Sequence, residues 1–269
     1  MPTLNRMPTL NRYLEVCCGS ILSVHRAVQG GAYRVELCSG LAEGGITPSL
    51  ALIEAALKVR GIRHHVLIRP RSGDFLYDDE EQDIIVRDIL LARRAGADGV
   101  VVGALTPDGD VDVSACRRFV EAAVGQGDDC YGIDCRQLRP VSLTFHRAFD
   151  VCRQPFHALE ELVSLGFHRI LTSGQASNAM DGIPLLKDLV GQAAGRIIIM
   201  PGCGVNVGNA ARILDATGAQ EIHASLRAVQ PSAMRYRHAG VSMGTPGTDE
   251  YATMETSVES VRAVVEAIG

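Results

Sequence analysis

The stretch LTFHRAFD at residues 143–150 decides the fold that we expect for this chain. Its first half alternates apolar residues with Thr144 and His146, which predicts a short β-strand with one apolar and one polar face. Its second half adds a cation and a carboxylate, Arg147 and Asp150. A buried polar face needs polar partners. We therefore expect this face to point into the mouth of a closed barrel.

Outward from this stretch, the chain repeats a short apolar strand followed by a helix. The strands are expected at residues 13–18, 33–38, 63–69, 98–103, 141–146, 168–173, 196–200 and 220–225. The helices are expected at residues 20–30, 47–60, 78–95, 113–124, 155–166, 182–194, 206–217 and 255–268, with Thr47 and Asn206 as two of the N-caps. Residues 125–139 and 226–254 read as surface loops.

Eight strand–helix units predict an α/β fold, a (β/α)₈ TIM barrel whose active mouth lies at the carboxyl ends of the strands. A doubly wound open sheet is the competing architecture, but its GxGxxG motif after the first strand is missing. Such barrels reach this length of 269 residues as one domain. We assign residues 13–269 to the barrel and residues 1–12, which repeat MPTLNR, to a tail outside it.

Composition narrows the class of function. The net charge of −5 and a pI near 5.9 argue against nucleic acid or an anionic membrane surface as the main partner. No apolar run is long enough to span a membrane, and no secretory leader pattern opens the chain. The eight cysteines are then expected to be free thiols in a reducing compartment.

The first two strands carry the related motifs LEVC and VELC. Alternation places Glu15, Cys17, Glu36 and Cys38 on the face that points into the barrel. Adjacent strands lie about 4.8 Å apart, so both thiols are within reach of one ion. Thiolates select soft metals such as Cu(I) and zinc; two suffice for Cu(I), whereas a structural zinc site needs four ligands. The alternative is that the thiols only pack the top of the barrel.

Further polar residues end the other strands, and buried charges must pair or bind a ligand. The turn PGCGVN also frees backbone N–H groups near a helix, as phosphate sites in barrels do, although it can equally be a tight turn. The alternative explanation of these residues is a purely structural ion-pair network. The catalytic candidates are Glu15, Glu36, His146, Asp150 and His223. The substrate-binding candidates are Arg69, Arg71, Arg147, Ser173, Gly202, Gly204 and Ser225.

The motifs LEVC, RVELCSGLAEGGITPS, IRPRSGDFLY, LTFHRAFD, RILTSGQ, IIIMPGCGV and MRYR, in this order, resemble the CutC copper homeostasis proteins. The resemblance runs from about residue 13 to the C-terminus. It implies a (β/α)₈ barrel, a cytoplasmic location, self-association as a dimer or tetramer, and copper handling with Cu(I) held by Cys17 and Cys38. Cys18 and Cys203 depart from the usual pattern, and either could supply a third thiolate.

Three functions follow from these observations. The first is a copper homeostasis protein that binds Cu(I) through the cysteines at the barrel mouth. The second is an enzyme that acts on a small carboxylated or phosphorylated molecule, clamped by arginines and served by an acid or base such as His146. The third is an interaction scaffold that has kept the barrel mouth of an ancestral protein.

Overall fold

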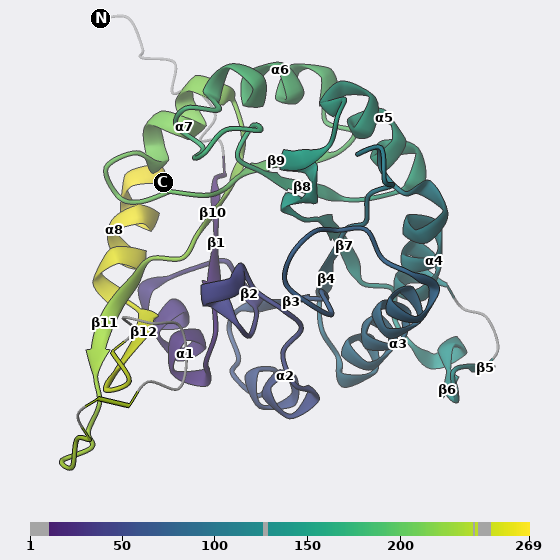
Figure 1. Ribbon diagram of the computed structural model, residues 1–269. Coiled ribbons are helices and arrows are strands. Elements are labelled where there is room, and N and C mark those ends of the chain that lie inside the picture. The colour runs from purple at the N-terminus through teal and green to yellow at the C-terminus, as the bar shows by residue number, and fades with distance from the viewer. Residues whose placement is uncertain (1–10, 126–128, 239, 242–248) are drawn as a thin grey trace, which may run out of the picture.

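The structure is a computed structural model that describes residues 11–125, 129–238, 240–241 and 249–269. Its main sheet holds eight parallel strands in the order β10-β1-β2-β3-β4-β7-β8-β9, and this sheet curls until β9 and β10 meet (Figure 1). The predicted (β/α)₈ barrel is confirmed. The strands are β1 Tyr13–Cys18, β2 Arg34–Leu37, β3 Arg63–Leu67, β4 Gly99–Val102, β7 Ser142–Phe145, β8 Arg169–Thr172, β9 Ile198–Pro201 and β10 Glu221–Ala224.

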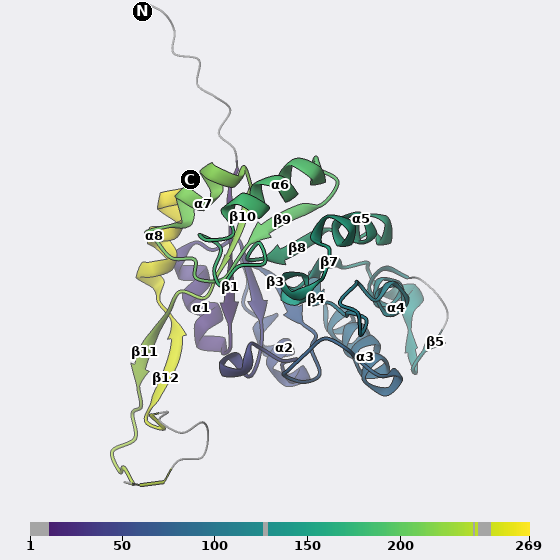
Figure 2. The same cartoon turned by 45° about the horizontal axis from the view of Figure 1, so that its top comes forward.

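Eight α-helices cover the outside of the barrel (Figure 2). The longest begins where Asp78 and Glu81 form a reciprocal capping box and ends at Gly96, which adopts a left-handed conformation with φ 106°. The helices described are α1 Ile21–Gly30, α2 Leu50–Ala56, α3 Asp79–Ala95, α4 Val113–Val124, α5 Pro155–Leu165, α6 Ile183–Ala193, α7 Ala210–Thr217 and α8 Val258–Ile268.

Two apolar clusters lie on opposite faces of the sheet. The larger one fills the space between the sheet and the helices, and it includes Val16, Val35 and Leu143, none of which is exposed. The smaller one lies inside the barrel and consists of Cys17, Cys38, Leu67 and Val101, with Leu41 packed against it. The alternation along the strands therefore separates a hydrophobic outer face from an inner face that mixes thiols and charges.

Three helix starts differ from the prediction. Helix α8 begins at Val258 instead of Glu255, because Glu255 and Thr256 belong to a strand. The other two are α2 and α7. Helix α2 begins at Leu50, with the Ser49 hydroxyl accepting from the Leu52 N–H at 3.2 Å, whereas the Thr47 hydroxyl accepts from the Arg69 N–H at 2.9 Å. Helix α7 begins at Ala210, because residues 206–209 form a turn before it. In both places the expected cap satisfies a neighbouring backbone group instead.

The two stretches predicted as loops contain secondary structure. Residues 125–139 hold the short strands β5 Asp129–Cys130 and β6 Ile133–Asp134 and a 3₁₀ turn, η2 Cys135–Gln137. The long connection before α8 forms an antiparallel ribbon that projects from the barrel, made of β11 Arg227–Pro231 and β12 Ala252–Thr256 (Figure 2). Residues 1–10 of the predicted tail lie outside the described residues. In the described part of the chain, no helix is both long and apolar enough to cross a bilayer.

Candidate metal centre in the barrel interior

The register of three adjacent strands places the candidate residues side by side. Glu15 of β1 lies opposite His223 of β10, and Cys17 lies opposite Glu36 of β2. Cys38 follows Glu36 by two residues and so faces the same interior. Both cysteines and both glutamates are buried, and His223 is nearly so. The five residues predicted to converge from these strands are therefore brought together.

The donor atoms of this cluster are close to one another. The Cys17 and Cys38 sulfurs are 3.6 Å apart, and the Cys38 sulfur lies 3.4 Å from Glu36 Oε2. His223 Nε2 lies 3.8 Å from the same carboxylate oxygen. One donor atom each from Cys17, Glu36 and His223 lies within 4.8 Å of the other two, a separation suited to holding a metal ion.

The electrostatics of the cluster favour an ionised Cys17. Hydrogen bonds to Cys38 and His223 stabilise its thiolate and outweigh burial, so the pKa of Cys17 falls to about 5. The pKa of Cys38 is raised, because its proton is shared with Cys17 and because the site is buried. Burial, reinforced by the nearby Cys17 and Glu15, raises the pKa of Glu36 to about 8. The site therefore concentrates negative charge on Cys17.

A layer of ion pairs supports the cluster from the amino ends of the strands. His223 Nδ1 lies 2.8 Å from Glu15 Oε1, and the Arg34 guanidinium contacts the other oxygen of Glu15. Arg34 also pairs with Glu221 at 2.5 Å, and Arg169 pairs with Glu221 from the opposite side. The sequence analysis missed these two arginines and Glu221. The same alternation could have found them, since Arg34 precedes Glu36, and Glu221 precedes His223, by two residues.

The end of β7 forms a separate polar group. His146 is buried beside Phe75, and its Nδ1 accepts from the Ala148 N–H at 3.2 Å. Burial and the neighbouring Arg69 lower the pKa of His146 to about 3, so the ring is neutral and its proton sits on Nε2. Within the described residues, no hydrogen-bond partner reaches this buried nitrogen. His146 is therefore suited to donate a hydrogen bond and unsuited to act as a base near neutral pH.

Asp150 links the segment after β7, η3 Arg147–Val151, to the end of β8. Its carboxylate accepts from the Thr172 hydroxyl at 2.5 Å and from the Ser173 N–H at 2.9 Å, and it pairs with Arg147 at 2.7 Å. The Arg147 side chain remains 45% exposed. Asp150, Arg147 and Ser173 are thus brought together, with contacts to one another.

Arg69 and Arg71, two members of the predicted clamp, contact groups of the fold. Arg69 donates to the carbonyls of Gly45 at 3.0 Å and Gly73 at 2.7 Å, which fixes two loops. Arg71 turns outward to Glu81 of α3 at 2.5 Å. Each of these two guanidinium groups therefore holds parts of the fold together.

The glycines of the turn after β9 are needed for close packing and for the turn. A Cβ at Gly202 would lie 2.5 Å from Leu171 Cδ1 and 3.3 Å from His223 Cβ, so the absence of a side chain leaves room for His223. Gly204 has φ 70°, which a tight turn requires. Ser225 follows β10 and is half-buried.

Neither additional cysteine joins the cluster. Cys18 lies on the outer face of β1, with its sulfur 3.9 Å from the Thr256 hydroxyl. Cys203 lies in the turn after β9 and donates to the Ser177 carbonyl at 3.3 Å. The expectation that either could supply a third thiolate is therefore wrong for this arrangement.

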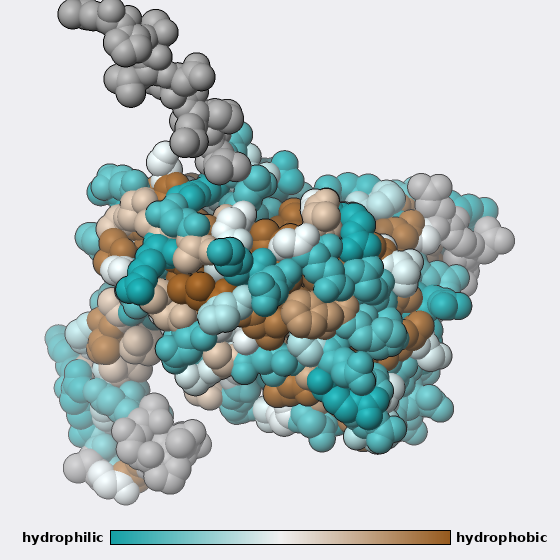
Figure 3. Space-filling model, turned by 90° about the horizontal axis from the view of Figure 1, so that it is seen from above, coloured by the Kyte–Doolittle hydropathy of each residue, from teal (hydrophilic) through white to brown (hydrophobic). Residues whose placement is uncertain are grey.

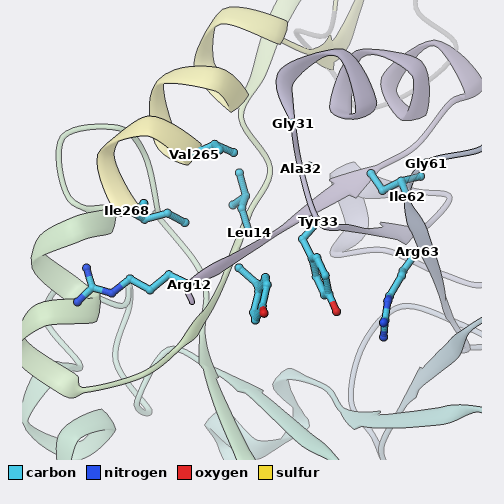
Figure 4. Close-up of a pocket in the computed structure, with 12 residues that line it drawn as sticks. Arg12, Leu14, Gly31, Ala32, Tyr33, Gly61, Ile62, Arg63, Val265 and Ile268 are labelled. Carbon is cyan, nitrogen blue, oxygen red and sulfur yellow. The ribbon is translucent and has the colours of Figure 1, made fainter. Parts of the chain in front are cut away.

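A cavity of about 620 Å³ lies at the opposite end of the barrel, between the amino ends of β1 and β3 and helix α8 (Figure 4). Its lining includes Arg12, Tyr33, Arg63 and Ile268, and none of the candidate site residues. It is thus distinct from the thiol cluster, which lies toward the carboxyl ends of the strands.

Comparisons with known proteins agree with this architecture. A CutC protein from Streptococcus agalactiae has a solved structure that is 35% identical, with a TM-score of 0.71 over 80% of this chain and 98% of that one. An aldolase with a TM-score of 0.58 is 15% identical over 81% of this chain and 92% of that one, and it shows the fold alone.

Curated relatives cover nearly the whole chain. A CutC family protein from Chromobacterium violaceum is 47% identical over 259 residues, which is 96% of this chain and 99% of the relative. The human copper homeostasis protein cutC homolog is 44% identical over 252 residues, 93% of this chain and 87% of the relative. The sequence profile of the CutC family matches residues 12–228, and the chain therefore belongs to the CutC family.

Proposed function

We propose that this protein handles copper by binding Cu(I) between the thiolates of Cys17 and Cys38. The observation that carries the proposal is the 3.6 Å separation of these two sulfurs inside the barrel. Thiolates are preferred ligands of Cu(I), and the lowered pKa of Cys17 makes a thiolate available at neutral pH. The names of the curated relatives, which refer to copper homeostasis, support the same role.

The surroundings of the two sulfurs suit a soft monovalent ion. Leu67 and Val101 pack against them from the neighbouring strands, and Cys38 is only 1% exposed. Such an apolar wall limits the access of water and oxidants to a bound ion. Because both thiols must stay reduced, we place the protein in the cytoplasm. Cell fractionation with an antibody to the native protein tests this location.

A competition titration tests copper binding. The reduced protein is titrated with Cu(I) against a chelator of known affinity, and we expect the double variant Cys17→Ser, Cys38→Ser to lose at least about 100-fold in affinity, since both soft ligands are gone. Cys18→Ser is the matched control, because it removes a buried neighbouring thiol from the opposite face of β1 and should bind as the parent does. Parent-like binding by the double variant would refute the proposal.

We also propose that the protein self-associates, as a dimer or tetramer, through the β11–β12 ribbon. Val229 and Met254 lie opposite each other on this ribbon and are 65% and 49% exposed. Two-stranded ribbons are seldom stable alone. Figure 3 shows a barrel wall of mixed hydropathy from which the ribbon projects. Val229→Glu should lower the mass measured by analytical ultracentrifugation. Ile84→Glu is the control, because Ile84 is an exposed side chain of α3 away from the ribbon, and it should leave the mass unchanged.

The second candidate function is catalysis on a small anion, and one observation favours it. His146 offers a buried Nε2–H donor that has no partner among the described residues, and Arg69 lies near enough to lower its pKa. Phosphate and short carboxylates are the probes, added singly in a thermal-shift assay. A rise in Tm that His146→Phe abolishes would support this candidate; no rise with any probe would count against it.

A further inference from the structure

We propose that the interior cluster also binds Zn²⁺, with Cys17, Glu36 and His223 as its three protein ligands. The proposal does not rest on copper binding, because it needs a carboxylate and an imidazole that a two-coordinate Cu(I) site does not use. Three strands supply the ligands: β1, β2 and β10.

The distances between donor atoms are near those around a tetrahedral ion. Bonds of about 2.3 Å to sulfur and about 2.0–2.2 Å to nitrogen and oxygen place the donors of a tetrahedral zinc about 3.4–3.8 Å from one another. Glu36 Oε2 and His223 Nε2 are 3.8 Å apart, and one donor atom each from Cys17, Glu36 and His223 lies within 4.8 Å of the other two. The Cys38 sulfur lies beside this group, 3.6 Å from the Cys17 sulfur and 3.4 Å from Glu36 Oε2.

His223 is held in the way that metal-binding histidines are held. Its Nδ1 lies 2.8 Å from Glu15, which accepts the Nδ1 proton. Hydrogen bonds to Cys17 and Glu15 and the charge of Glu36 outweigh burial and raise the pKa of His223, so Nε2 also holds a proton in the metal-free protein, and Zn²⁺ would take the place of that proton. Histidine ligands of zinc commonly donate their other N–H to a carboxylate in this manner. Arg34 fixes Glu15 in turn. The site thus has both its ligands and the residues that orient them.

The charges of the two interior layers also point to a divalent ion. In the lower layer, Arg34 and Arg169 face Glu15 and Glu221, so two positive charges match two negative ones. In the upper layer, the Cys17 thiolate and the Glu36 carboxylate together carry two negative charges when both are ionised. Zn²⁺ would replace the protons that Glu36 and His223 hold in the metal-free protein and would neutralise these two anions. Mg²⁺ and Ca²⁺ fit poorly, because both prefer oxygen ligands.

The test uses the metal-free, reduced, full-length protein titrated with Zn²⁺ against a chromophoric chelator. We expect one Zn²⁺ per chain, and a loss of at least about tenfold in Zn²⁺ affinity for Glu36→Gln and for His223→Gln. Glu15→Gln, a positioning change, should weaken binding by about tenfold or more while the ligands remain. Cys18→Ser is the control and should bind as the parent does. Glu36→Gln should lose less affinity for Cu(I) than for Zn²⁺, because Cu(I) is held by the two thiolates and does not need the carboxylate.

Cobalt provides a readout that does not depend on variants folding. Co²⁺ added to the parent should give intense tetrahedral ligand-field bands and a sulfur-to-cobalt charge-transfer band. Weak octahedral bands, no Zn²⁺ binding by the parent, or unchanged Zn²⁺ affinity in both ligand variants would overturn the zinc proposal. A parent protein that binds Zn²⁺ but not Cu(I) would instead refute only the copper proposal.

Discussion

Cys17 and Cys18 are neighbours in the sequence, yet they lie on opposite faces of the barrel wall. Cys17 points inward, where its sulfur is 3.6 Å from that of Cys38 and its pKa falls to about 5. Cys18 points outward among apolar side chains, and burial, with the charge of Cys17, raises the pKa of its thiol. One step along β1 therefore changes a thiol from a candidate ligand into a core residue.

Burial alone does not explain this difference, because both thiols are buried. The polar neighbours of each thiol explain the difference. On the inner face, Cys17 has Cys38 and His223 as hydrogen-bond partners, whereas on the outer face Cys18 has one long contact, to Thr256. A buried group ionises where its charged form is stabilised by hydrogen bonds and opposite charge. The two faces of the wall are thus chemically different surfaces made by a single period-two pattern.

The largest expected contrast is in acidity. Ultraviolet thiolate absorbance of the metal-free protein, followed against pH, should show a thiol that ionises near pH 5, because hydrogen bonds stabilise the Cys17 thiolate. The step should persist in Cys18→Ser and disappear in Cys17→Ser. If Cys18→Ser removed the step, the assignment of the two faces would be reversed.

Breaking an inner ion pair should cost more stability than breaking an outer one. Glu221→Ala leaves Arg34 and Arg169 buried without their shared carboxylate, and we expect it to lower the free energy of unfolding by about 3–5 kcal/mol. Glu160→Ala removes a surface pair with Arg196 and should cost under about 1 kcal/mol. Urea unfolding measures both. Equal costs would mean that the inner layer is not a connected ion network.

The inner face should also give stability a pH dependence. Burial raises the pKa of Glu36 from its ordinary value of 4.5 to about 8. Between these pH values the Glu36 carboxyl is protonated in the folded protein and ionised in the unfolded chain. This contribution is complete below about pH 4.5 and is lost as the pH rises toward 8. The metal-free parent should therefore lose stability relative to Glu36→Gln over that interval. A constant difference across the interval would show that Glu36 ionises normally in the fold.

The smallest expected contrast is between the stability effects of alanine substitutions at two glycines. Gly202→Ala places a Cβ 2.5 Å from Leu171 Cδ1 and 3.3 Å from His223 Cβ, and we expect it to cost about 1–3 kcal/mol and to weaken metal binding. Gly191→Ala, inside α6, meets nothing within 4 Å and should stabilise the protein by up to about 1 kcal/mol. Thermal unfolding with a metal titration distinguishes them. Parent-like metal binding by Gly202→Ala would show that this glycine does not position His223.

The eight strand–helix units predicted the barrel, and period-two alternation predicted the convergence of Glu15, Cys17, Glu36, Cys38 and His223. These residues lie on regular strands, where direction follows from position. Arg71 shows the limit of the method. It follows β3 closely in the sequence, but its long side chain turns outward to Glu81, a choice that depends on where α3 packs.

The β11–β12 ribbon was missed for a different reason. Its strands do not alternate cleanly, and Pro231, which cannot donate a ladder hydrogen bond, ends β11. The ribbon is held by pairing between segments far apart in the sequence, such as Val229 with Met254. Local pattern carries little information about pairing of this kind.

The central claim is that the inner face of β1 and β2 holds a thiophilic metal ion. Anomalous diffraction at the copper absorption edge, from crystals of the reduced protein loaded with Cu(I), tests it most directly. We predict one strong anomalous peak between the sulfurs of Cys17 and Cys38. A copper peak elsewhere on the chain, with no density between these two sulfurs, would contradict the claim.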